Sequence, residues 1–576
     1  MKVKHNPKPW DFLDSYRGKN FEGEWPTLVE MFEISTIRYP SNKCFEAYTP
    51  DHDVYDYMDV NKIVKRVANF LIKSGIKHGD KVGLTGKNSP EWGFAYLGTL
   101  FAGAVIVPID YSLSCEEISK LMQFADVKFL FADEEKINKL DIPEAIAKVS
   151  LEKSAEKNYI LNKQEKQDQK IELPKADEVA AILFTSGTTG TPKGVQLTHE
   201  NFVSDCYLAQ GNMNIFPTDI FYAILPIHHA YTMLAVFIES LSVGAACVFG
   251  KKLIISQIFK EMRDSKVTMF LGVPMLFNKL IAGLLHGVRE KGIFVYGLVR
   301  MLMGISGFIK KVFHVNPGKR MFGFLLKQIA LENNRICICG GGPLPSSTFK
   351  HFNELGIDFV QGYGLTETSP IDTLNPIFAY EETSIGKISP GIEMKVVDPD
   401  SEGNGVLYVR GPNVMKGYYK NQEATDEIIN REGWLNTGDV GHIDAKNYVY
   451  LTGRKKNIIV TAGGKNVFPE EVEDHFQLYN DIEQICVAGY VVDKKTKSEA
   501  ICAIIYPSES CIKKYQDDKK GLDKYINSLV DEVDKDLISY KKIRKVVVVD
   551  EPMEMTSTKK IQRFKVFDKY KELINE

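Results

Sequence analysis

Short apolar runs alternate with amphipathic stretches over most of the chain, and this alternation restricts its fold more than any other feature. In residues 61–71 apolar side chains recur at helical spacing, and Gly75 follows where a helix would end. Short runs that are continuously apolar are typical of parallel strands covered on both faces. We predict such strands at residues 81–84, 104–108, 127–131, 179–184, 221–225, 245–249 and 335–339. The sequence therefore predicts an α/β fold with layered, mostly parallel sheets.

The chain is expected to form two domains, because 576 residues exceed the size that one hydrophobic core usually supports. Composition changes near residue 455, and beyond it Pro469 suits the first turn of a helix while residues 543–549 suit a strand. We predict a large N-terminal domain over residues 1–455 and a small mobile α+β domain over residues 456–576. Residues 152–172 are rich in polar side chains and are expected to form a solvated connection.

Charge and cysteine usage narrow the functional classes. The net charge is −3, so no overall field favours nucleic acid, and none is expected as a partner. The 9 cysteines are odd in number and scattered in apolar runs, which favours reduced thiols and a cytoplasmic location. Cys337 and Cys339 lack a companion pair and are expected in a core strand rather than at a metal. The polar N-terminal residues give no signal-peptide pattern.

Residues 185–195, TSGTTGTPKGV, carry the sharpest motif and directly follow an apolar run. Glycines let a backbone fold closely around phosphate, while hydroxyls, free amides and one lysine donate to its oxygens. The stretch is not a Walker A loop, because its lysine is followed by glycine rather than serine or threonine. A plain glycine-rich turn is the alternative. The predicted phosphate-binding residues are Thr185, Ser186, Gly187, Thr188, Thr189, Gly190 and Lys193.

This stretch resembles the signature of the adenylate-forming superfamily of acyl- and aryl-CoA synthetases, peptide-synthetase adenylation domains and beetle luciferases. Segments that resemble its other motifs follow in the same order: GGGP at 340–343, YGLTETSP at 363–370, WLNTGDVG at 434–441, GRKKN at 453–457, GGKNVFPE at 463–470 and MTSTKKIQR at 555–563. The resemblance implies an enzyme that uses ATP and Mg²⁺ to activate a carboxylic acid as its acyl-adenylate.

The first of these motifs imply how the nucleotide and metal are held. An aromatic ring is a suitable partner for a purine face, so Tyr363 is expected to stack on adenine. Thr366 would donate to phosphate, and Glu367, as a hard oxygen ligand, would bind Mg²⁺. The remaining residues of the predicted nucleotide site around Tyr363 are Gly341, Gly342, Pro343, Gln361, Gly362 and Gly364.

The later motifs imply residues that act between the two domains. Asp439 would accept hydrogen bonds from the ribose hydroxyls, and Arg454 would contact the nucleotide. Lys456 is expected at the hinge about which the small domain turns between half-reactions. Lys560 would bridge the substrate carboxylate and the α-phosphate. Lys559 stands where many members have glycine, which leaves the adjacent lysine as the alternative.

Two further residues are expected along the passage for the acyl chain and the pantetheine arm. Gly464 lies in the loop that resembles the one entering the site during thioester formation, where glycine permits close approach. His229, in LPIHHA, occupies the lining position of another motif. His228 and His229 are expected to line this passage rather than bind a metal, because no carboxylate or cysteine lies at ligand spacing.

Residues 281–328 resemble an insert of bacterial long-chain acyl-CoA synthetases. Its apolar part, 292–309, contains Arg300 and has basic residues on both sides. A membrane-spanning helix disfavours a central arginine, so a surface-lying helical pair on anionic lipid is expected. A buried helical hairpin with a polar edge is the alternative.

The resemblance implies a medium- to long-chain fatty acid as substrate and coenzyme A as acyl acceptor. A close alternative is transfer to an acyl carrier protein, which uses the same adenylating residues. A catalytically silent lipid- or nucleotide-binding protein is a third reading. The expected location is cytoplasmic, with peripheral contact to the inner membrane face.

Overall fold

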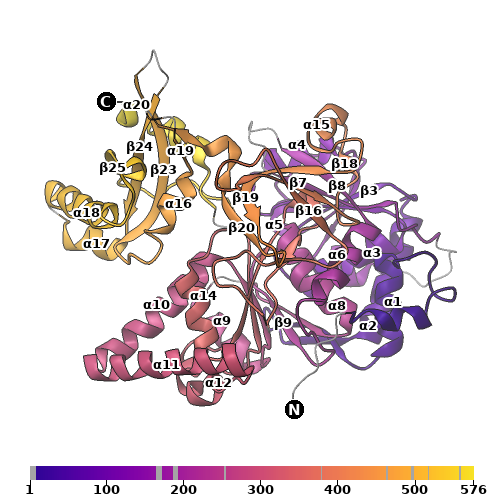
Figure 1. Ribbon diagram of the computed structural model, residues 1–576. Helices are drawn as coiled ribbons and strands as arrows, with labels where there is room; N and C mark the ends of the chain where they lie inside the picture. Colours follow the sequence, from indigo (N-terminus) through magenta and orange to yellow (C-terminus); the bar gives the residue numbers. More distant parts are fainter. Residues whose placement is uncertain are drawn as a thin grey trace.

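The computed structural model describes residues 8–163, 172–185, 192–251, 254–377, 379–461, 463, 465–493, 498–516, 518–556 and 560–575. A large body holds most of the chain, and the C-terminal residues form a smaller lobe beside it (Figure 1). The predicted α/β fold is confirmed, and each predicted strand lies within two residues of an observed one.

One sheet of the body has the order β15-β14-β13-β12-β11-β9-β10-β1-β2. Its inner strands, from β1 to β13 across the sheet, pair in parallel, whereas β2, β14 and β15 are antiparallel to their neighbours. The bounds are β1 Lys43–Ala47, β2 Asp53–Asp56, β9 Ile220–Ala223, β10 Ala246–Phe249, β11 Met269–Gly272, β12 Ile336–Cys339, β13 Asp358–Tyr363, β14 Thr373–Leu374 and β15 Lys387–Ile388.

A second sheet has the order β18-β8-β7-β4-β3-β5-β6. The strands from β7 to β6 pair in parallel, and β8 and β18 add an antiparallel edge. The bounds are β3 Lys81–Thr85, β4 Val105–Pro108, β5 Val127–Ala132, β6 Ala147–Ser150, β7 Val179–Thr185, β8 Lys193–Thr198 and β18 Gly417–Tyr418.

Helix α3 (Pro90–Phe101) is buried at every position and packs against strands of both sheets. Its sequence, PEWGFAYLGTLF, is apolar on nearly all sides, as a helix enclosed by protein requires. Trp92 stacks on Tyr96, and both meet the edge of Phe237. The predicted helix at 61–71 is confirmed within α2 (Tyr57–Lys73), which packs on α3.

The other helices of the body cover the sheets or connect their strands. They are α1 Leu28–Arg38, α4 Cys115–Phe124, α5 Glu134–Ile137, α6 His199–Gln210, α7 Ala230–Thr232, α8 Glu239–Val243, α9 Ile255–Asp264, α14 Ser346–Glu354 and α15 Gln422–Ile428, with a π-helix at Met233–Ile238. Of the predicted solvated connection at 152–172, residues 164–171 lie outside the described part of the chain; in the rest, 3-10 helices occupy Lys153–Asn158 and Ile160–Asn162, and only Tyr159 and Ile160 are buried.

An antiparallel sheet of order β16-β17-β19-β20 connects the body to the C-terminal lobe. Its strands are β16 Glu393–Val397, β17 Gly405–Arg410, β19 Leu435–Ile443 and β20 Val449–Arg454. Phe468 from the lobe packs with Val406 and Val440 of this sheet. The two parts of the chain therefore share a small apolar contact beside β20.

The C-terminal lobe is built on the sheet β23-β24-β25, which has an apolar core on each face. Side chains along β24 alternate between the faces: Ile501 and Ala503 enter one core, and Cys502 and Ile504 the other. The elements are β21 Ile459–Val460, β22 Asn466–Val467, β23 Ile482–Asp493, β24 Ser498–Pro507, β25 Lys545–Val548, α16 Pro469–Asp474, α17 Glu509–Lys514, α18 Lys519–Asp534, α19 Arg563–Lys569 and α20 Lys571–Asn575. Pro469 begins α16, as predicted.

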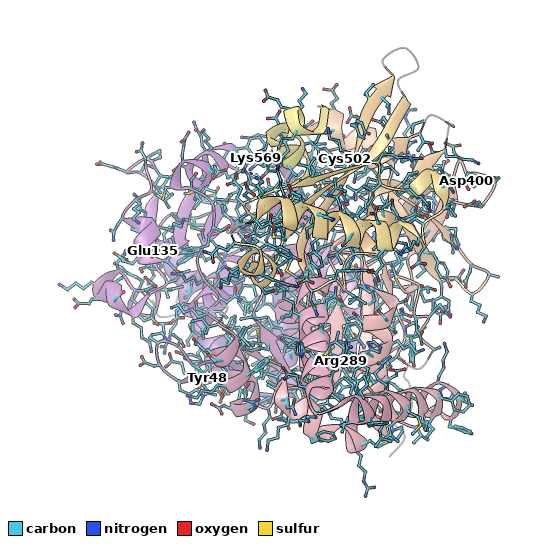
Figure 2. The ribbon with its side chains drawn as sticks, turned by 90° about the vertical axis from the view of Figure 1, so that its left-hand side faces the viewer. Tyr48, Glu135, Arg289, Asp400, Cys502 and Lys569 are labelled. Carbon is cyan, nitrogen blue, oxygen red and sulfur yellow. The ribbon has the colours of Figure 1, made fainter. Side chains whose placement is uncertain are left out.

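The insert forms α10 (Pro274–Glu290), α11 (Ile293–Phe313), α12 (Gly318–Met321) and α13 (Gly323–Gln328). Helices α10 and α11 extend from the lower left of the body in Figure 1. Figure 2 shows the same region below the C-terminal lobe. Among the described residues, α11 is the one helix long and apolar enough to cross a membrane, yet little of it is buried by protein. The alternative of a buried hairpin therefore does not hold for α11.

Candidate active site

The candidate site lies at the carboxyl ends of β11, β12 and β13. These strands are parallel and in register, with Gly272 beside Cys339 and Cys339 beside Gln361. The loops that leave them therefore emerge at one edge of the sheet, where α/β proteins usually bind ligands. They bring together two predicted nucleotide-binding loops: the adenine loop, residues 340–343, after β12, and the adenylate loop, residues 363–370, after β13.

The adenine loop lies within van der Waals distance of the C-terminal lobe and of α10. Gly341 has a φ of +83°, in the region that favours glycine, and a Cβ there would lie 3.8 Å from Cε of Lys560. A Cβ at Gly342 would lie 3.7 Å from Pro274 at the start of α10. The Pro343 carbonyl accepts a hydrogen bond from Gln477 of the C-terminal lobe at 3.5 Å. This loop is therefore one of the places where the lobe contacts the body.

Tyr363, Asp439 and Arg454 form the predicted nucleoside end of the site. The Tyr363 hydroxyl donates to Oδ2 of Asp439 at 2.7 Å, and Nε of Arg454 lies 2.9 Å from Oδ1. Asp439 and Arg454 are cross-strand partners on β19 and β20, which fixes their separation. The carboxylate is buried and raises the pKa of Arg454 from its ordinary value. A preformed, buried diol acceptor thus stands beside a cation and an aromatic ring.

The predicted phosphate end is organised around a tyrosine that sequence reasoning missed. The Tyr418 hydroxyl donates to Oε1 of Glu367 at 2.8 Å, while Nζ of Lys193 lies 4.6 Å from the centroid of its ring. Lys193 pairs with Thr185 across β7 and β8, so both ends of the phosphate loop are held. Residues Ser186, Gly187, Thr188, Thr189 and Gly190 lie outside the described part of the chain.

Tyr418 reaches this position because β18 adds to the edge of β8, with Tyr418 opposite Val195. Burial, reinforced by Glu367, raises the pKa of Tyr418, so the hydroxyl remains a donor at neutral pH. The only local sequence signal is the Gly417-Tyr418-Tyr419 segment, which does not disclose its distant partners.

A buried polar network shapes the loop that carries Thr366 and Glu367. Thr368 and Asn413 each donate to the Asp372 carboxyl group, at 2.7 and 2.9 Å. Burial raises the pKa of Asp372 to about 7. This network was also missed, because Asn413 lies far along the chain from the loop it supports.

Glycines let the same loop turn closely on itself. A Cβ at Gly364 would lie 1.9 Å from the Pro370 carbonyl oxygen, so no other residue fits this turn. Gly362 is also confined, with a Cβ position 3.0 Å from Leu374. Gln361 is buried in β13, and its carbonyl accepts from Asn375 at 2.8 Å. Gln361 and Gly362 thus form the strand end beneath the site.

Lys560 extends from the C-terminal lobe toward the adenine loop of the body. Its backbone N–H donates to the Thr556 hydroxyl at 3.1 Å, and the chain closes a small loop through the Met555–Ile561 bridge. The side chain remains open to water, although the surrounding protein and the nearby Arg454 lower its pKa. Of the two adjacent lysines, Lys560 is described beside Gly341, whereas Lys559 lies outside the described residues.

Lys456 lies in a short 3-10 turn, Lys455–Asn457, between β20 and β21. Its side chain is exposed, and its neighbour Asn457 donates to Glu470 at 2.6 Å. The lobe is held to α10 by Lys279–Glu483 at 2.6 Å and by a hydrogen bond from Asn278 to Gln477 at 3.1 Å. These few polar contacts suit a lobe that changes position.

The ring of the predicted passage residue His229 contacts that of His228, with centroids 4.1 Å apart and planes tilted by 45°. Burial lowers the pKa of His229 well below its ordinary value, and both His228 and Lys560 add to this effect. Oδ2 of Asp110 lies 3.5 Å from Nε2 of His228. The expectation that no carboxylate accompanies these histidines is therefore wrong, because the fold brings Asp110 from the end of β4. Gly464 lies outside the described residues.

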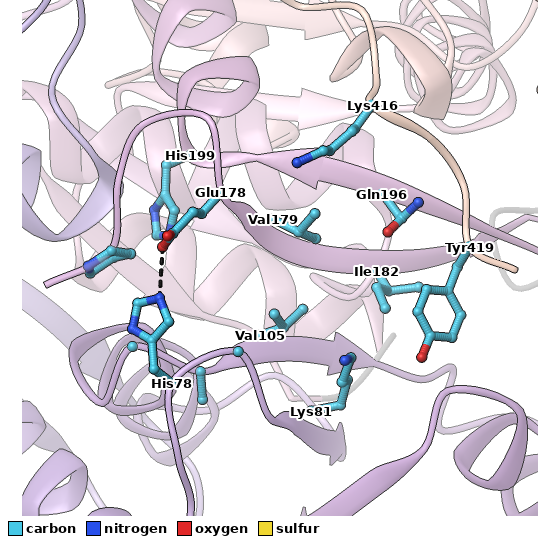
Figure 3. A pocket seen from close by; sticks show the side chains of 14 residues that line it. His78, Lys81, Val105, Glu178, Val179, Ile182, Gln196, His199, Lys416 and Tyr419 are labelled. Carbon is cyan, nitrogen blue, oxygen red and sulfur yellow. Dashed lines mark hydrogen bonds and ion pairs between the residues drawn. The ribbon is translucent and has the colours of Figure 1, made fainter. Parts of the chain in front are cut away.

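The pocket in Figure 3 belongs to another part of the body. His78 and Glu178 join across it with a 2.8 Å hydrogen bond, and Val179 lines it. Val179 begins the strand whose last residue, Thr185, enters the phosphate loop. None of the predicted site residues that the structure describes lines this pocket.

With this geometry in place, comparison with known proteins identifies the class. The model of the AMP-binding enzyme family matches residues 33–419, and that of the AMP-binding enzyme C-terminal domain matches residues 456–576. The chain therefore belongs to the AMP-binding enzyme family.

Individual relatives resemble the chain over most of its length. The mouse long-chain-fatty-acid–CoA ligase ACSBG2 is 27% identical over 83% of this chain and 76% of its own. A feruloyl-CoA synthase from Amycolatopsis is 28% identical over 79% of this chain and 84% of its own. The ATP-bound structure of MatB from Rhodopseudomonas palustris superposes with a TM-score of 0.75 at 23% identity, covering 96% of this chain and 100% of that one.

Proposed function

We propose that this protein is an ATP-dependent acid–thiol ligase that converts a medium- to long-chain fatty acid to its acyl-AMP and then to its coenzyme A thioester. One observation carries the proposal. The Tyr363–Asp439 pair and the Lys193–Tyr418–Glu367 group define two ends of one site. Lys560 lies between the C-terminal lobe and the body, beside Gly341. A buried diol acceptor at one end, and at the other a lysine and a carboxylate that both contact Tyr418, suit a nucleoside triphosphate.

In the proposed first step, a carboxylate oxygen attacks the α-phosphorus of ATP, and the bond to pyrophosphate breaks. Negative charge accumulates around that phosphorus, and Lys560 is the cation placed to stabilise it from the lobe. In the second step the thiol sulfur attacks the acyl carbon, loses its proton and displaces AMP. No side-chain nucleophile is needed in either step.

The residues present fit a magnesium ion at the phosphate end. Glu367 offers a hard carboxylate oxygen, and its present partner is a neutral hydroxyl that can be exchanged. Bound there, Mg²⁺ would neutralise phosphate charge as a Lewis acid. The neighbouring Lys193 would contribute a second positive charge on the protein side.

The choice of a fatty acid rests on relatives of modest identity. Mouse ACSBG2 is named a long-chain-fatty-acid–CoA ligase, but a feruloyl-CoA synthase is similar to the same degree. The exposed apolar helix α11 favours the fatty acid, because a lipid-facing element suits a substrate that resides in membranes. An acyl carrier protein in place of coenzyme A remains the second candidate, since it would use the same adenylating residues.

We further propose a cytoplasmic location. All 9 cysteines are free thiols, and every one except Cys115 is buried. Thiols enclosed in cores without pairing suit a reducing compartment.

The test is acid-dependent release of AMP from ATP, measured with acids from acetate to oleate, and run with coenzyme A and separately with holo acyl carrier protein. The proposal expects AMP and thioester with a C8–C18 acid and coenzyme A. Product with carrier protein alone would favour the second candidate. A catalytically silent binding protein would release no AMP with any acid or acceptor.

A further inference from the structure

Helix α11 turns an apolar stripe toward solvent. The stripe runs the length of the helix, with spacings of four and three residues that keep its members on one face. Phe294 is 91% exposed and Phe308 62% exposed. The stripe consists of Phe294, Leu298, Met301, Ile305, Phe308 and Val312, all exposed. An amphipathic helix of a soluble protein usually turns its apolar face toward the core and its polar face toward water.

The opposite face of α11 holds the polar contacts that fix this orientation. Lys310 is buried, pairs with Asp358 at 2.7 Å and donates to Asn353 at 2.8 Å. Arg300 lies 3.8 Å from Glu354 on α14. Arg300, the central arginine that disfavours a membrane-spanning helix, therefore contacts the folded body. The helix cannot rotate its apolar stripe inward without breaking these ion pairs.

Exposed cations surround the stripe. Arg289 and Lys291 lie at the turn between α10 and α11, and Arg289 is labelled in Figure 2. Lys311, whose Nζ lies 3.9 Å from Oε1 of Glu382, is near the other end of the stripe, and Arg320 lies on α12. One acid, Glu290, is also exposed at the turn and lies near His286. The balance is cationic and complements an anionic surface.

Length alone does not make α11 a membrane span. Its 21 residues extend about 30 Å, which matches a bilayer core. Its polar face, however, stays attached to the folded body through Lys310 and Arg300. Only the stripe can enter lipid, with the helix axis in the plane of the membrane.

We propose that the stripe of α11, with its cationic border, is a docking surface for an anionic lipid bilayer. Apolar insertion supplies most of the binding free energy, and the lysines and arginines add an attraction that salt weakens. A protein partner would not require cations at both ends of the stripe. The surface binds lipid whether or not the chain is a ligase, so the two proposals can fail separately.

The surface lies at the far end of a helix that begins at the candidate site. Pro274, the first residue of α10, is next to Gly342, and the last turn of α10 reaches Arg289. A 17-residue helix is about 26 Å long. Docking would thus hold the site at a fixed distance from the bilayer that supplies its acid.

Vesicle flotation of the full chain, without substrates, tests the proposal. Vesicles of phosphatidylcholine with phosphatidylglycerol should carry the protein at low salt, and phosphatidylcholine alone or high salt should carry much less. The variant F294E/L298E/F308E should lose at least tenfold in vesicle affinity. Ile37→Glu with Val54→Glu and Leu173→Glu, three exposed apolar positions outside the insert, is the matched control and should bind like wild type.

Absence of wild-type flotation on anionic vesicles would overturn the proposal, as would equal binding by the stripe variant. If the stripe instead covers a second copy of the chain, sedimentation would show a dimer that the stripe variant disperses, with no lipid binding. Phe308→Trp avoids the risk of misfolding: brominated lipid should quench its added fluorescence, and unchanged fluorescence would contradict insertion.

Discussion

Replacement of Asp439 by asparagine should remove most of the recognition of ribose. The two carboxylate oxygens now accept from Tyr363 and pair with Arg454, at 2.7 and 2.9 Å. Asparagine keeps one acceptor and replaces the other with a donor, so one charge-assisted hydrogen bond is lost and a second is weakened. At about 1.5–3 kcal/mol for a full bond to a charged group, the sum is about 2–4 kcal/mol. Since about 1.4 kcal/mol is tenfold, kcat/KM for ATP should fall about 30- to 1,000-fold.

Acid-dependent exchange of pyrophosphate with ATP would measure this loss, repeated with 2′,3′-dideoxy-ATP. The analogue lacks the hydroxyls, so Asp439→Asn should cost it much less than it costs ATP. An equal loss with both nucleotides would refute the assignment of ribose to Asp439. Thermal unfolding of the variant is the control, because Asp439 also anchors Arg454.

Three other changes follow from the same geometry. Tyr418→Phe removes the donor to Glu367 but keeps the ring beside Lys193; we expect KM for Mg·ATP to rise several-fold, with Tyr419→Phe unaffected as the matched control. Desolvation by the surrounding protein, together with the charge of Arg454, lowers the pKa of Lys560 below 10.5; kcat/KM for ATP should therefore begin to fall below pH 10.5 as the pH rises, and Lys560→Arg should move this fall to higher pH. Because burial raises the pKa of Asp372 to about 7, its contribution to stability is lost as pH rises from about 4 to about 7; Asp372→Asn should reduce the difference between urea midpoints at pH 5 and pH 8.

Each of these expectations has a contradicting result. An unchanged KM in Tyr418→Phe would mean that its hydroxyl does not position Glu367. Identical alkaline limbs for lysine and arginine at position 560 would assign the fall to another group. A stability difference between pH 5 and pH 8 that Asp372→Asn leaves unchanged would mean that this carboxyl is already ionised at acidic pH.

The strands, helix α2 and the start of α16 could be predicted because their signals are local. Runs such as residues 179–184 are apolar throughout, and a strand enclosed on both faces needs no other pattern. The roles of Asp439 and Lys560 were predicted differently, from the resemblance of the continuous segments that contain them to family motifs. The structure then brings these separate signatures to one edge of a sheet.

The residues that contact and position the motif side chains could not be predicted, because they are distant from those side chains in sequence. Tyr418 meets Glu367 through an added edge strand, and Asp110 meets His228 through the ends of strands in different sheets. The orientation of α11 posed the same problem. Its residues are apolar on most sides, so the exposed face is decided by the ion pairs of Arg300 and Lys310 with α14 and β13.

The most direct test of the account is the exchange of labelled pyrophosphate into ATP in the absence of coenzyme A. Adenylate formation predicts exchange that requires a fatty acid and falls at least a hundredfold in Lys560→Ala. The same variant should still transfer the acyl group from supplied acyl-AMP to coenzyme A. Wild-type protein that exchanges no pyrophosphate with any acid, or Lys560→Ala that exchanges it normally, would contradict the central claim.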